Sequence, residues 1–412
     1  MKQSGSEPNF IGFEEAFKLA HANVPLLSEE LRPTHEALGR IASRPIPARV
    51  DSPSVDASLK DGYAVRSVDV ATATPSSSIE LRLVGSVGAG GSTVMELVPG
   101  AAIRILSGAV IPRGADAVLA EEFAVNEGDI VKVFADAHSG RNILTRGTDV
   151  NAGETLVQSG EKLTPAKVGI LVAGGVTEVW VYRRPRVGLL ATGDEVLLLD
   201  RPMDEGKVYA SNIALQEAWL CSLGLDCMTG VCGDSSAQII SYINSMLSDL
   251  DVLVTSGGAW TGDRDLIAKA MDQLGWRPIF HRVRMGPGKA VRMGLLNGKP
   301  IFCLPGGPPS NEMAFFMIVL PALLRMSGCD KPPFPKFYGR LTQEISGQLD
   351  WTQFIHCSVL TQDSEFRVVP LNMTRRLSAM SRTQAIVKIP EGIERLDSRT
   401  VVPFTMVDGE YF

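Results

Sequence analysis

The sequence has no excess of basic residues and no long apolar stretch. Its 412 residues include 40 Lys and Arg against 46 Asp and Glu, a formal net charge of −6. Because nucleic-acid-binding proteins usually carry a basic surface, we expect no nucleic-acid partner. The longest apolar run, Met313 to Leu324, is interrupted by Pro321 and is shorter than the ~20 residues of a membrane span. The polar first residues lack the basic and apolar segments of a secretory signal, so we expect a cytoplasmic protein outside the membrane.

Cysteine is also scarce, and glycine and proline are not abundant enough for a disordered chain. The six cysteines form no Cys-x-x-Cys pair, and zinc sites need closer ligand spacing, so we expect reduced and mostly buried thiols. The 40 glycines and 25 prolines make up about 16% of the chain, below the ~25–30% typical of disorder. At ~100–200 residues per domain, the length predicts two to four folded domains.

The first part of the chain predicts helices followed by a β-rich insert. Apolar spacing predicts helices at Phe13 to Ala22 and Thr34 to Ala42. Thr164 to Ala173 is a further predicted helix, with Thr164 as N-cap and a proline at its first position. Between these helices, short alternating runs separated by Gly, Pro and Ser predict three strands, at Ile79 to Val84, Ala102 to Leu106 and Ile130 to Phe134.

From Arg186 onward, predicted strands alternate with predicted helices, which indicates a parallel sheet covered on both faces. The strands are Val187 to Ala191, Cys227 to Val231, Val252 to Thr255 and Ile301 to Leu304. The helices are Asn212 to Leu223, Ser236 to Leu247, Asp265 to Leu274 and Ser310 to Leu324. A proline-rich linker, Lys331 to Lys336, then leads to short strands that run to Phe412. The predicted fold class is multidomain α/β plus β.

Glycine-rich turns follow three of the predicted parallel strands. The ends of parallel strands meet at one edge of a sheet, where ligands bind in such folds. Glycine lets backbone N–H groups approach an anion closely, so three such turns together predict an oxyanion or phosphate pocket. None matches a P-loop or GxGxxG, which disfavours ordinary ATPases and dehydrogenases. The turns are Thr192-Gly193-Asp194-Glu195, Ser256-Gly257-Gly258 and Pro305-Gly306-Gly307-Pro308-Pro309-Ser310.

Carboxylates and one lysine accompany these turns. Carboxylates beside phosphate loops usually hold Mg²⁺ or bind ribose and ring N–H groups. Helix N-capping is the simpler alternative for Asp263 and Asp265, which lie at the start of the predicted Asp265 to Leu274 helix. Lys289 follows another turn, Met285-Gly286-Pro287-Gly288, and would offset the charge of an anionic substrate, unless it is a solvated loop lysine. The carboxylates are Asp194, Glu195, Asp234, Asp263 and Asp265.

The β insert carries polar turns whose residue types and spacing alone do not indicate a function. Asp61-Gly62 is a turn signal, so a hairpin is the simplest interpretation of this segment. The turns around Ser107 and at Arg146-Gly147-Thr148-Asp149 have the same simple interpretation.

Taken in order, these segments resemble the molybdopterin molybdenumtransferase family, known as MoeA in bacteria and as the E domain of gephyrin in animals. The resemblance extends over nearly the whole chain, from about residue 10 to 412. It rests on eight short motifs in the family's order: Lys60-Asp61-Gly62-Tyr63-Ala64-Val65-Arg66, Arg104-Ile105-Leu106-Ser107-Gly108, Gly114-Ala115-Asp116-Ala117-Val118, Arg146-Gly147-Thr148-Asp149, Thr192-Gly193-Asp194-Glu195, Ser256-Gly257-Gly258, Pro287-Gly288-Lys289 and Leu304-Pro305-Gly306.

The resemblance implies four domains and a homodimer. The domains would be an elongated connector (1–50 and 142–184), an inserted β domain (51–141), a molybdopterin-binding α/β domain (185–330) and a C-terminal β domain (335–412). Each active site would combine the α/β domain of one chain with the β insert of the other. The implied reaction inserts molybdate into adenylylated molybdopterin with release of AMP, assisted by Mg²⁺. A molybdopterin adenylyltransferase and molybdoenzyme apoproteins or chaperones are the implied partners.

The strand-end turns and carboxylates, and for Asp61 and Ser107 the resemblance, assign roles to residues. Asp61, Ser107, Glu195 and Asp265 would be catalytic, and Glu195, Asp234 and Asp265 would hold the metal ion. The cofactor-binding residues would be Thr192, Gly193, Asp194, Ser256, Gly257, Gly258, Lys289, Pro305, Gly306, Pro308 and Ser310.

The chain departs from the family pattern at the Gly307-Pro308-Pro309 turn and at Gly286, where a lysine is usual. These departures leave tungstate open as an alternative oxyanion. They also leave open a non-catalytic molybdopterin-binding or scaffold protein. Pyrophosphatase or deamidase relatives that share the α/β domain are a third alternative, which the β insert disfavours.

Overall fold

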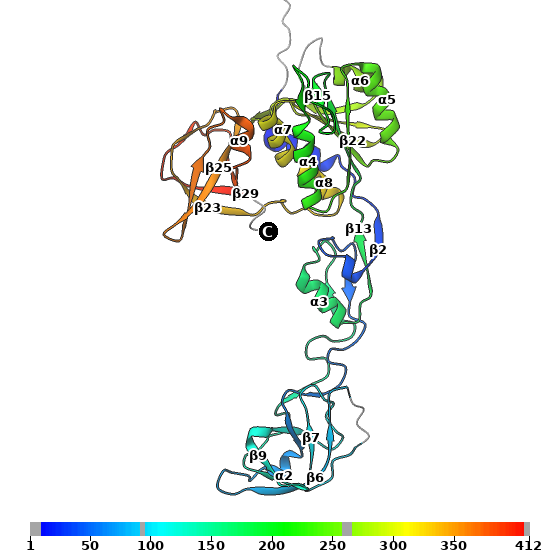
Figure 1. Ribbon diagram of the computed structural model, residues 1–412, viewed down its shortest axis with the longest axis vertical. Helices are drawn as coiled ribbons and strands as arrows, with labels where there is room; N and C mark the ends of the chain where they lie inside the picture. Colours follow the sequence, from blue (N-terminus) through cyan, green and yellow to red (C-terminus); the bar gives the residue numbers. More distant parts are fainter. Residues whose placement is uncertain (1–9, 91–94, 258–265, 408–412) are drawn as a thin grey trace, which may run out of the picture. The chain divides into compact units, whose positions relative to one another are not determined.

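The computed structural model describes residues 10–90, 95–257 and 266–407 (Figure 1). The chain folds as two compact units. One unit comprises Met1–Glu29 and Tyr182–Phe412, and the other comprises Glu30–Val181. None of the helices within the described ranges combines the length and apolar character needed to cross a bilayer. The division into four domains stays a prediction.

The Glu30–Val181 unit contains a six-stranded sheet, and the three strands predicted for the insert are confirmed. Tyr63, Leu81 and Leu119 are buried in one apolar cluster of this sheet, and Ile103 and Val118 in another. Alternating side chains thus fill a core on each side of the strands. The strand order is β8 (Ala117–Ala120), β5 (Gly62–Val65), β7 (Ala101–Ile105), β6 (Ile79–Val87), β10 (Ile130–Val133) and β9 (Ala124–Asn126).

The predicted helix at Thr34 to Ala42 is wrong. Only a 3₁₀ turn, η1 (Thr34–Glu36), forms there. Gly39 follows with a φ of 76°, and Ile41 and Ala42 form β-bridges with residues far along the chain. The apolar spacing that suggested a helix is satisfied instead by packing of Ala37, Ala42 and their neighbours in a small core.

The helix α3 (Pro165–Ala173) begins where the sequence predicts it. Thr164 is the N-cap, and its hydroxyl accepts a hydrogen bond from the Lys167 N–H at 3.3 Å. Such a cap satisfies one of the backbone donors that a helix start leaves unpaired.

We expect Thr164→Ala to destabilise α3 by about 1 kcal/mol, because the Lys167 N–H loses its acceptor. Amide hydrogen exchange across residues 165–173 would report the loss directly. Thr164→Ser keeps the hydroxyl and serves as the control. Equal protection in the alanine and serine variants would contradict the role of this cap.

The other unit is built around a mostly parallel sheet. Strands β17 (Cys227–Cys232), β14 (Val187–Thr192), β18 (Val252–Ser256) and β22 (Lys299–Leu304) are parallel neighbours, as predicted. The sequence did not predict β21 (Arg292–Leu296) and β19 (Arg277–His281), which extend one edge in antiparallel order.

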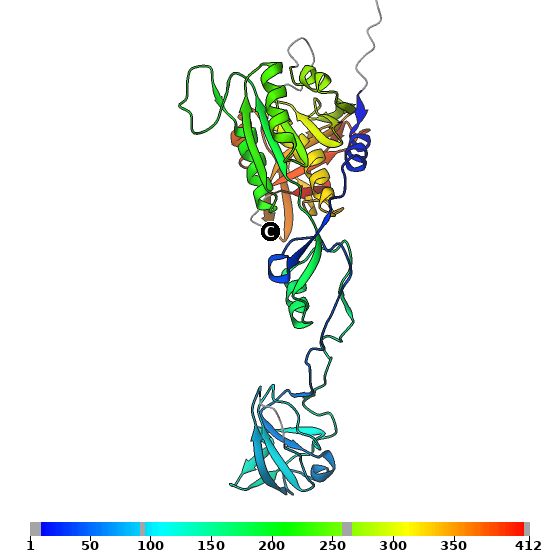
Figure 2. The ribbon, with the colours of Figure 1, turned by 90° about the vertical axis from the view of Figure 1, so that its right-hand side faces the viewer.

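Helices cover both faces of this sheet (Figures 1 and 2). On one face, α4 (Ser211–Ser222) packs against α7 (Pro308–Ala314), and on the other α5 (Ser236–Leu247) packs against α6 (Leu266–Gln273). Strand residues alternate between the two cores: Leu189, Val254 and Phe302 contribute to the first, and Leu190, Leu253 and Cys303 to the second. This alternation, buried on both sides, explains the nearly continuous apolar strands in the sequence.

The predicted helix Ser310 to Leu324 forms with different bounds and an irregular middle. Helix α7 passes through a π-helical turn, Phe315–Val319, into α8 (Leu320–Met326). Pro321 lacks a backbone N–H and cannot make the usual helical bond, so a locally widened turn is a reasonable accommodation.

A seven-stranded sheet completes this unit and recruits two strands from distant segments. These are β1 (Ile11–Gly12), next to helix α1 (Phe13–Ala22), and β20 (Val283–Gly286). Strand β20 pairs with β25 (Thr352–Gln362), which carries the segment before Lys289 into the C-terminal sheet. The remaining strands are β26 (Glu365–Pro370), β23 (Lys336–Leu341), β29 (Val401–Met406) and β27 (Ala385–Ile389).

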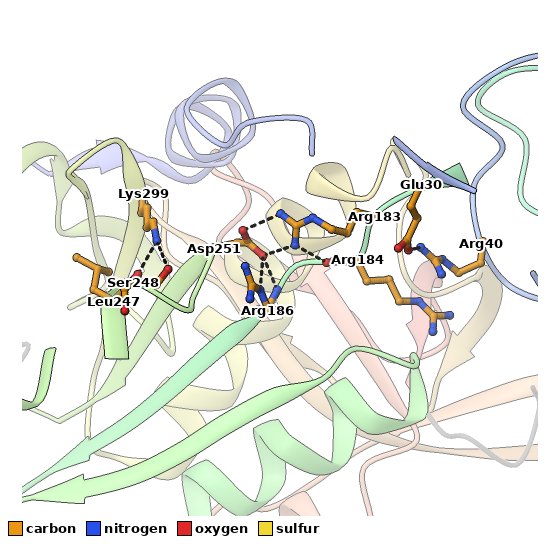
Figure 3. A network of polar contacts seen from close by, with 9 residues as sticks. All are labelled: Glu30, Arg40, Arg183, Arg184, Arg186, Leu247, Ser248, Asp251 and Lys299. Carbon is orange, nitrogen blue, oxygen red and sulfur yellow. Dashed lines mark hydrogen bonds and ion pairs between the residues drawn. The ribbon is translucent and has the colours of Figure 1, made fainter. Parts of the chain in front are cut away.

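An ion-pair cluster of Arg183, Arg186 and Asp251 stabilises the segment that leads into the parallel sheet (Figure 3). Both terminal nitrogens of Arg183 donate to the Asp251 carboxylate, at 2.7 and 2.8 Å, and the Arg186 N–H donates to it at 2.8 Å. Burial alone would raise the pKa of Asp251, but the hydrogen bonds from Arg183 and Arg186 outweigh it and lower that pKa. The cluster joins the residues before β14 to the turn before β18.

All six cysteines are free thiols. Cys232, Cys303 and Cys357 are buried, whereas Cys221 is exposed, so burial is less general than the sequence predicted. Burial raises the pKa of Cys357 to about 12, which keeps it as an unreactive thiol.

Candidate functional site

The predicted glycine turns leave the same edge of the parallel sheet. Ala191 at the end of β14 is in register with Ser256 at the end of β18, and Ser256 is in register with Leu304 at the end of β22. The turns that follow therefore begin side by side. The first continues into an excursion, 195–210, that contains the short parallel pair β15 (Val196–Leu197) and β16 (Val208–Tyr209). This excursion is the green loop that extends from the α/β core in Figure 2, and the sequence did not predict it.

One of these glycines is required by the close approach of neighbouring backbone, and a second lies in contact with it. Gly257 has a φ of 104°, and a Cβ there would lie 2.7 Å from the Thr192 carbonyl oxygen. A Cβ on Gly306 would lie 3.7 Å from the Gly257 Cα, so the 256–257 and 305–306 turns are also in contact. The predicted convergence of Thr192, Gly257 and Gly306 is thus present in the structure. Gly258 lies outside the described residues.

The turn before Lys289 reaches the same group of loops. Gly288 has a φ of 115°, and a Cβ there would lie 3.3 Å from the Ser310 carbonyl oxygen. Ser310 belongs to the first turn of α7, which begins at Pro308. The structure therefore brings the 286–289 turn beside the 305–310 turn, although the two segments belong to different sheets.

An amide side chain that the sequence analysis missed ties these turns together. The side-chain NH₂ of Asn212, at the start of α4, donates to the Ser256 hydroxyl at 3.0 Å and to the Gly306 carbonyl at 2.9 Å. One residue thus bridges the turns after β18 and β22.

A second amide, on the neighbouring helix α7, bridges the same two turns. The side-chain NH₂ of Asn311 donates to the Ser256 hydroxyl at 3.0 Å and to the Pro305 carbonyl at 2.9 Å. Its oxygen accepts from the fully buried Gln216 side chain at 2.6 Å. These bonds hold Asn311 in one geometry, although Oε1 of Gln216 has no hydrogen-bond partner among the described residues. The sequence signal for Gln216 and Asn311 is weak, since each is a single amide on an apolar helix face.

The structure brings the Asp194 carboxylate to the backbone of Asp234. Oδ1 of Asp194 accepts from the Asp234 N–H at 2.9 Å, and Lys207 donates to the Asp194 carbonyl at 2.7 Å. The Glu195 carboxylate lies over Gly193, within 2.6–2.9 Å of a Cβ built there. Asp263 and Asp265 lie outside the described residues. In the part of the chain that is described, no three His, Cys, Asp or Glu side chains gather as a ready metal site.

Within the other unit, the structure brings Asp61 and Ser107 together. Oδ1 of Asp61 accepts from the Ser107 N–H at 2.7 Å, and the Asp61 carbonyl accepts from the Glu121 N–H at 3.0 Å. Asp61 therefore orders the 105–109 turn. The hairpin predicted at Asp61-Gly62 is wrong, because Gly62 begins β5, which pairs with β7 and β8 and not with the preceding strand β4 (Ala57–Ser58).

The comparisons with known proteins cover both units. A family model described as "MoeA N-terminal region (domain I and II)" matches residues 11–175, and one described as "Probable molybdopterin binding domain" matches residues 188–325. Two solved structures of a molybdopterin biosynthesis MoeA protein from Pyrococcus horikoshii each cover 97% of this chain and 100% of their own. They are 31% and 28% identical, with TM-scores of 0.84 and 0.82.

The chain belongs to the MoeA family. Relatives named molybdopterin molybdenumtransferase agree with this placement. The protein of Bacillus subtilis is 28% identical over 91% of this chain and 89% of its own length. Molybdopterin molybdenumtransferase 2 of Mycobacterium tuberculosis is 29% identical over 89% and 92%. The MoeA match over residues 11–175 also disfavours the pyrophosphatase or deamidase alternative, as the sequence predicted.

Beside the MoeA loops, helix α7 carries a buried acid that the sequence analysis missed. Glu312 is 5% exposed, and burial raises its pKa to about 8. The imidazole of His356, on β25, lies 3.6 Å away and is 2% exposed, and burial lowers its pKa to about 4. Both groups are therefore uncharged near pH 7 when nothing else binds them. The one sequence signal was a glutamate at the border of the longest apolar run.

We expect the stability of this protein to fall as pH rises from about 4.5 to about 8, relative to Glu312→Gln. In the unfolded chain the Glu312 carboxyl ionises near pH 4.5, whereas in the folded chain it stays protonated until about pH 8. The Glu312 contribution to stability is thus full below pH 4.5 and is lost through this window. The loss of unfolding free energy between pH 5 and pH 8 should be larger in the wild type than in the variant by on the order of 3 kcal/mol.

Thermal and urea unfolding at several pH values would measure this difference. The exposed Glu217→Gln on the neighbouring α4 is the matched control and should follow the wild type. Parallel pH curves for wild type and Glu312→Gln would contradict the assigned protonation state.

Proposed function

We propose that this MoeA-family chain is a molybdopterin molybdenumtransferase, which inserts molybdate into adenylylated molybdopterin and releases AMP. The observation that carries the proposal is the convergence of four turns, 192–195, 256–257, 286–289 and 305–310, at one sheet edge. All four lie within the segment matched as a probable molybdopterin binding domain. The substrate carries phosphate groups and meets an oxyanion, and glycine turns suit both.

The residues at this sheet edge would have different roles, according to their chemistry. The N–H groups of Gly193 and Gly257 themselves donate to backbone carbonyls, so neighbouring N–H groups of these turns and of the Gly306 turn would bind phosphate oxygens. Lys289 would neutralise part of the substrate charge. Asn212 and Asn311 are positioning residues. Their hydrogen bonds to Ser256 and to the carbonyls of Pro305 and Gly306 hold the turns in place.

The carboxylates at this sheet edge would bind Mg²⁺ only together with the phosphate groups of the substrate. Mg²⁺ in phosphoryl-transfer sites is usually held by one or two carboxylates plus substrate phosphates. Asp194 and Asp234 are adjacent, and Glu195 belongs to the same turn. We assign Glu195, Asp234 and Asp265 to the ion, which when bound would neutralise phosphate charge and ease the departure of AMP.

We also propose a homodimer in which the β insert of one chain completes the site of the other. The Asp61 carboxylate accepts a hydrogen bond from the Ser107 N–H and so holds the turn from which the Ser107 hydroxyl would reach a substrate. Asp61 is then a positioning residue and Ser107 the group that reaches the neighbouring pocket. A molybdopterin adenylyltransferase would supply the substrate, and molybdoenzyme apoproteins or chaperones would receive the product.

The function is tested by AMP release. The protein, loaded with adenylylated molybdopterin and Mg²⁺, should release AMP on addition of molybdate, at a rate that rises with molybdate concentration. Tungstate in place of molybdate measures the oxyanion preference. Binding of the adenylylated substrate without AMP release under either oxyanion would favour the scaffold alternative.

A further inference from the structure

Gln353, the second residue of β25, lies over the 286–289 turn. The parallel pairing of β20 with β25 places Gly286 opposite Gln353. A Cβ on Gly286 would lie 2.5 Å from Oε1 and 2.9 Å from Nε2 of Gln353, so the amide of this side chain fills the space beside the glycine. Gly286 is also the position at which a lysine is usual in the family. An amide from another strand therefore stands where the stem of that lysine would begin.

The hydrogen-bonding groups of this amide are unused by the rest of the chain. Gln353 is half-buried, and its side chain has no hydrogen-bond partner among the described residues. A glutamine amide offers two N–H donors and one acceptor oxygen. A partly desolvated donor forms a stronger hydrogen bond than one that is fully exposed to water. The Gln353 amide is thus available to a ligand that reaches the 286–289 turn.

The nearest arginine on β20 does not replace the missing lysine. Arg284 lies two residues before Gly286, on the same face of the strand. Its guanidinium pairs with the Glu391 carboxylate at 3.5 Å and donates to the Phe10 carbonyl at 2.8 Å, so it is committed to the N-terminal segment and to the C-terminal sheet. The 286–289 turn itself contributes one cation, Lys289, and the Gln353 amide is the additional donor at this turn.

We propose that Gln353 is a further substrate-binding residue, whose side-chain NH₂ donates to an anionic oxygen of the ligand at the 286–289 turn. This assignment rests on the proposed function, which brings molybdate and the phosphates of adenylylated molybdopterin to these turns. The charged oxygens of both ligands accept hydrogen bonds, so the NH₂ group rather than the amide oxygen faces them. At this turn the chain thus offers one cation and one neutral donor to the oxyanion.

The steady-state kinetics of AMP release in Gln353 variants test the proposal. Loss of a hydrogen bond to a charged group weakens binding by roughly ten- to hundredfold. We therefore expect Gln353→Ala to raise KM at least tenfold for molybdate or for adenylylated molybdopterin, with kcat within about threefold of the wild type. The substrate whose KM rises identifies the ligand of the amide as the oxyanion or a phosphate. Gln353→Glu removes the donors and adds a negative charge, so it should raise the same KM further.

A lysine introduced at position 286 gives the sharper test. Gln353→Ala vacates the space beside Gly286, so Gly286→Lys in that background should return KM to within about threefold of the wild type. Gln362→Ala, at the exposed far end of β25, is the matched control and should leave both KM values unchanged. Unchanged KM values in Gln353→Ala, or no recovery in the double variant, would overturn the proposal.

Equilibrium dialysis with radiolabelled molybdate, and with adenylylated molybdopterin, separates this proposal from the proposed function. If the wild type binds these ligands but releases no AMP, the proposed function fails, whereas the role of Gln353 stands provided that Gln353→Ala binds one of them at least tenfold more weakly. If the wild type and Gln353→Ala bind both ligands equally, with equal circular dichroism spectra, the role of Gln353 is overturned and the function is untouched.

Discussion

Gly257→Ala is expected to lower molybdate-dependent AMP release at least hundredfold, about 2.7 kcal/mol in the barrier. The new Cβ would lie 2.7 Å from the Thr192 carbonyl oxygen, on a backbone whose φ of 104° disfavours any side chain. The short contact and the unfavourable φ can be relieved only if the 256–257 turn moves away from the 192–195 turn. AMP quantified by chromatography under saturating molybdate would measure the loss.

Gly307→Ala is the matched control for this change. It lies in the adjacent loop, has a φ of −70°, and a Cβ there meets nothing within 4 Å. We expect it to retain activity within about threefold of the wild type. Comparable activity in Gly257→Ala and Gly307→Ala would mean that the close approach of the two turns is not required.

Mixed dimers of Asp61→Ala and Lys289→Ala chains are expected to recover about half of the wild-type activity per dimer, although each parent dimer is nearly inactive. If each site combines the insert of one chain with the sheet edge of the other, one site of the mixed dimer carries both lesions and the second carries neither. Dimers exchanged before assay and confirmed by mass spectrometry would give this result. A site confined to one chain would place one lesion in each site and restore nothing.

A second mixture controls for nonspecific recovery. Asp61→Ala and Ser107→Ala both fall in the insert, so their mixed dimer has one damaged insert at each site and should stay inactive. Recovery in this mixture, or none in the first, would contradict the shared site. A monomeric mass in light scattering at micromolar concentration would contradict the homodimer itself.

The site could be predicted from the sequence where the signal was local. Glycines placed directly after apolar strands marked the turns at Thr192, Ser256 and Pro305, since parallel strands end at a common edge. Helices α1 and α5 form with the predicted bounds because their apolar spacing matches the faces that they bury. The wrong helix at Thr34 to Ala42 had similar spacing, but long-range β-bridges determine that segment.

What the sequence could not supply was pairing between distant segments. Asn311, Gln216 and Asn212 are ordinary helix residues until folding places them around Ser256. Strand β20 joins the C-terminal sheet by pairing with β25, and local periodicity carries no information about such long-range pairing. The charge states of Glu312 and His356 likewise depend on a burial that only the packed fold creates.

A single turnover with adenylylated molybdopterin tests the central claim most directly. Protein in excess over adenylylated molybdopterin, with Mg²⁺, is mixed with molybdate, and AMP and pterin-bound molybdenum are both quantified. The account predicts one AMP and one bound molybdenum for each substrate molecule, and neither product in appreciable amount when molybdate is omitted. AMP released at the same rate without molybdate, or no AMP at any molybdate concentration, would contradict it.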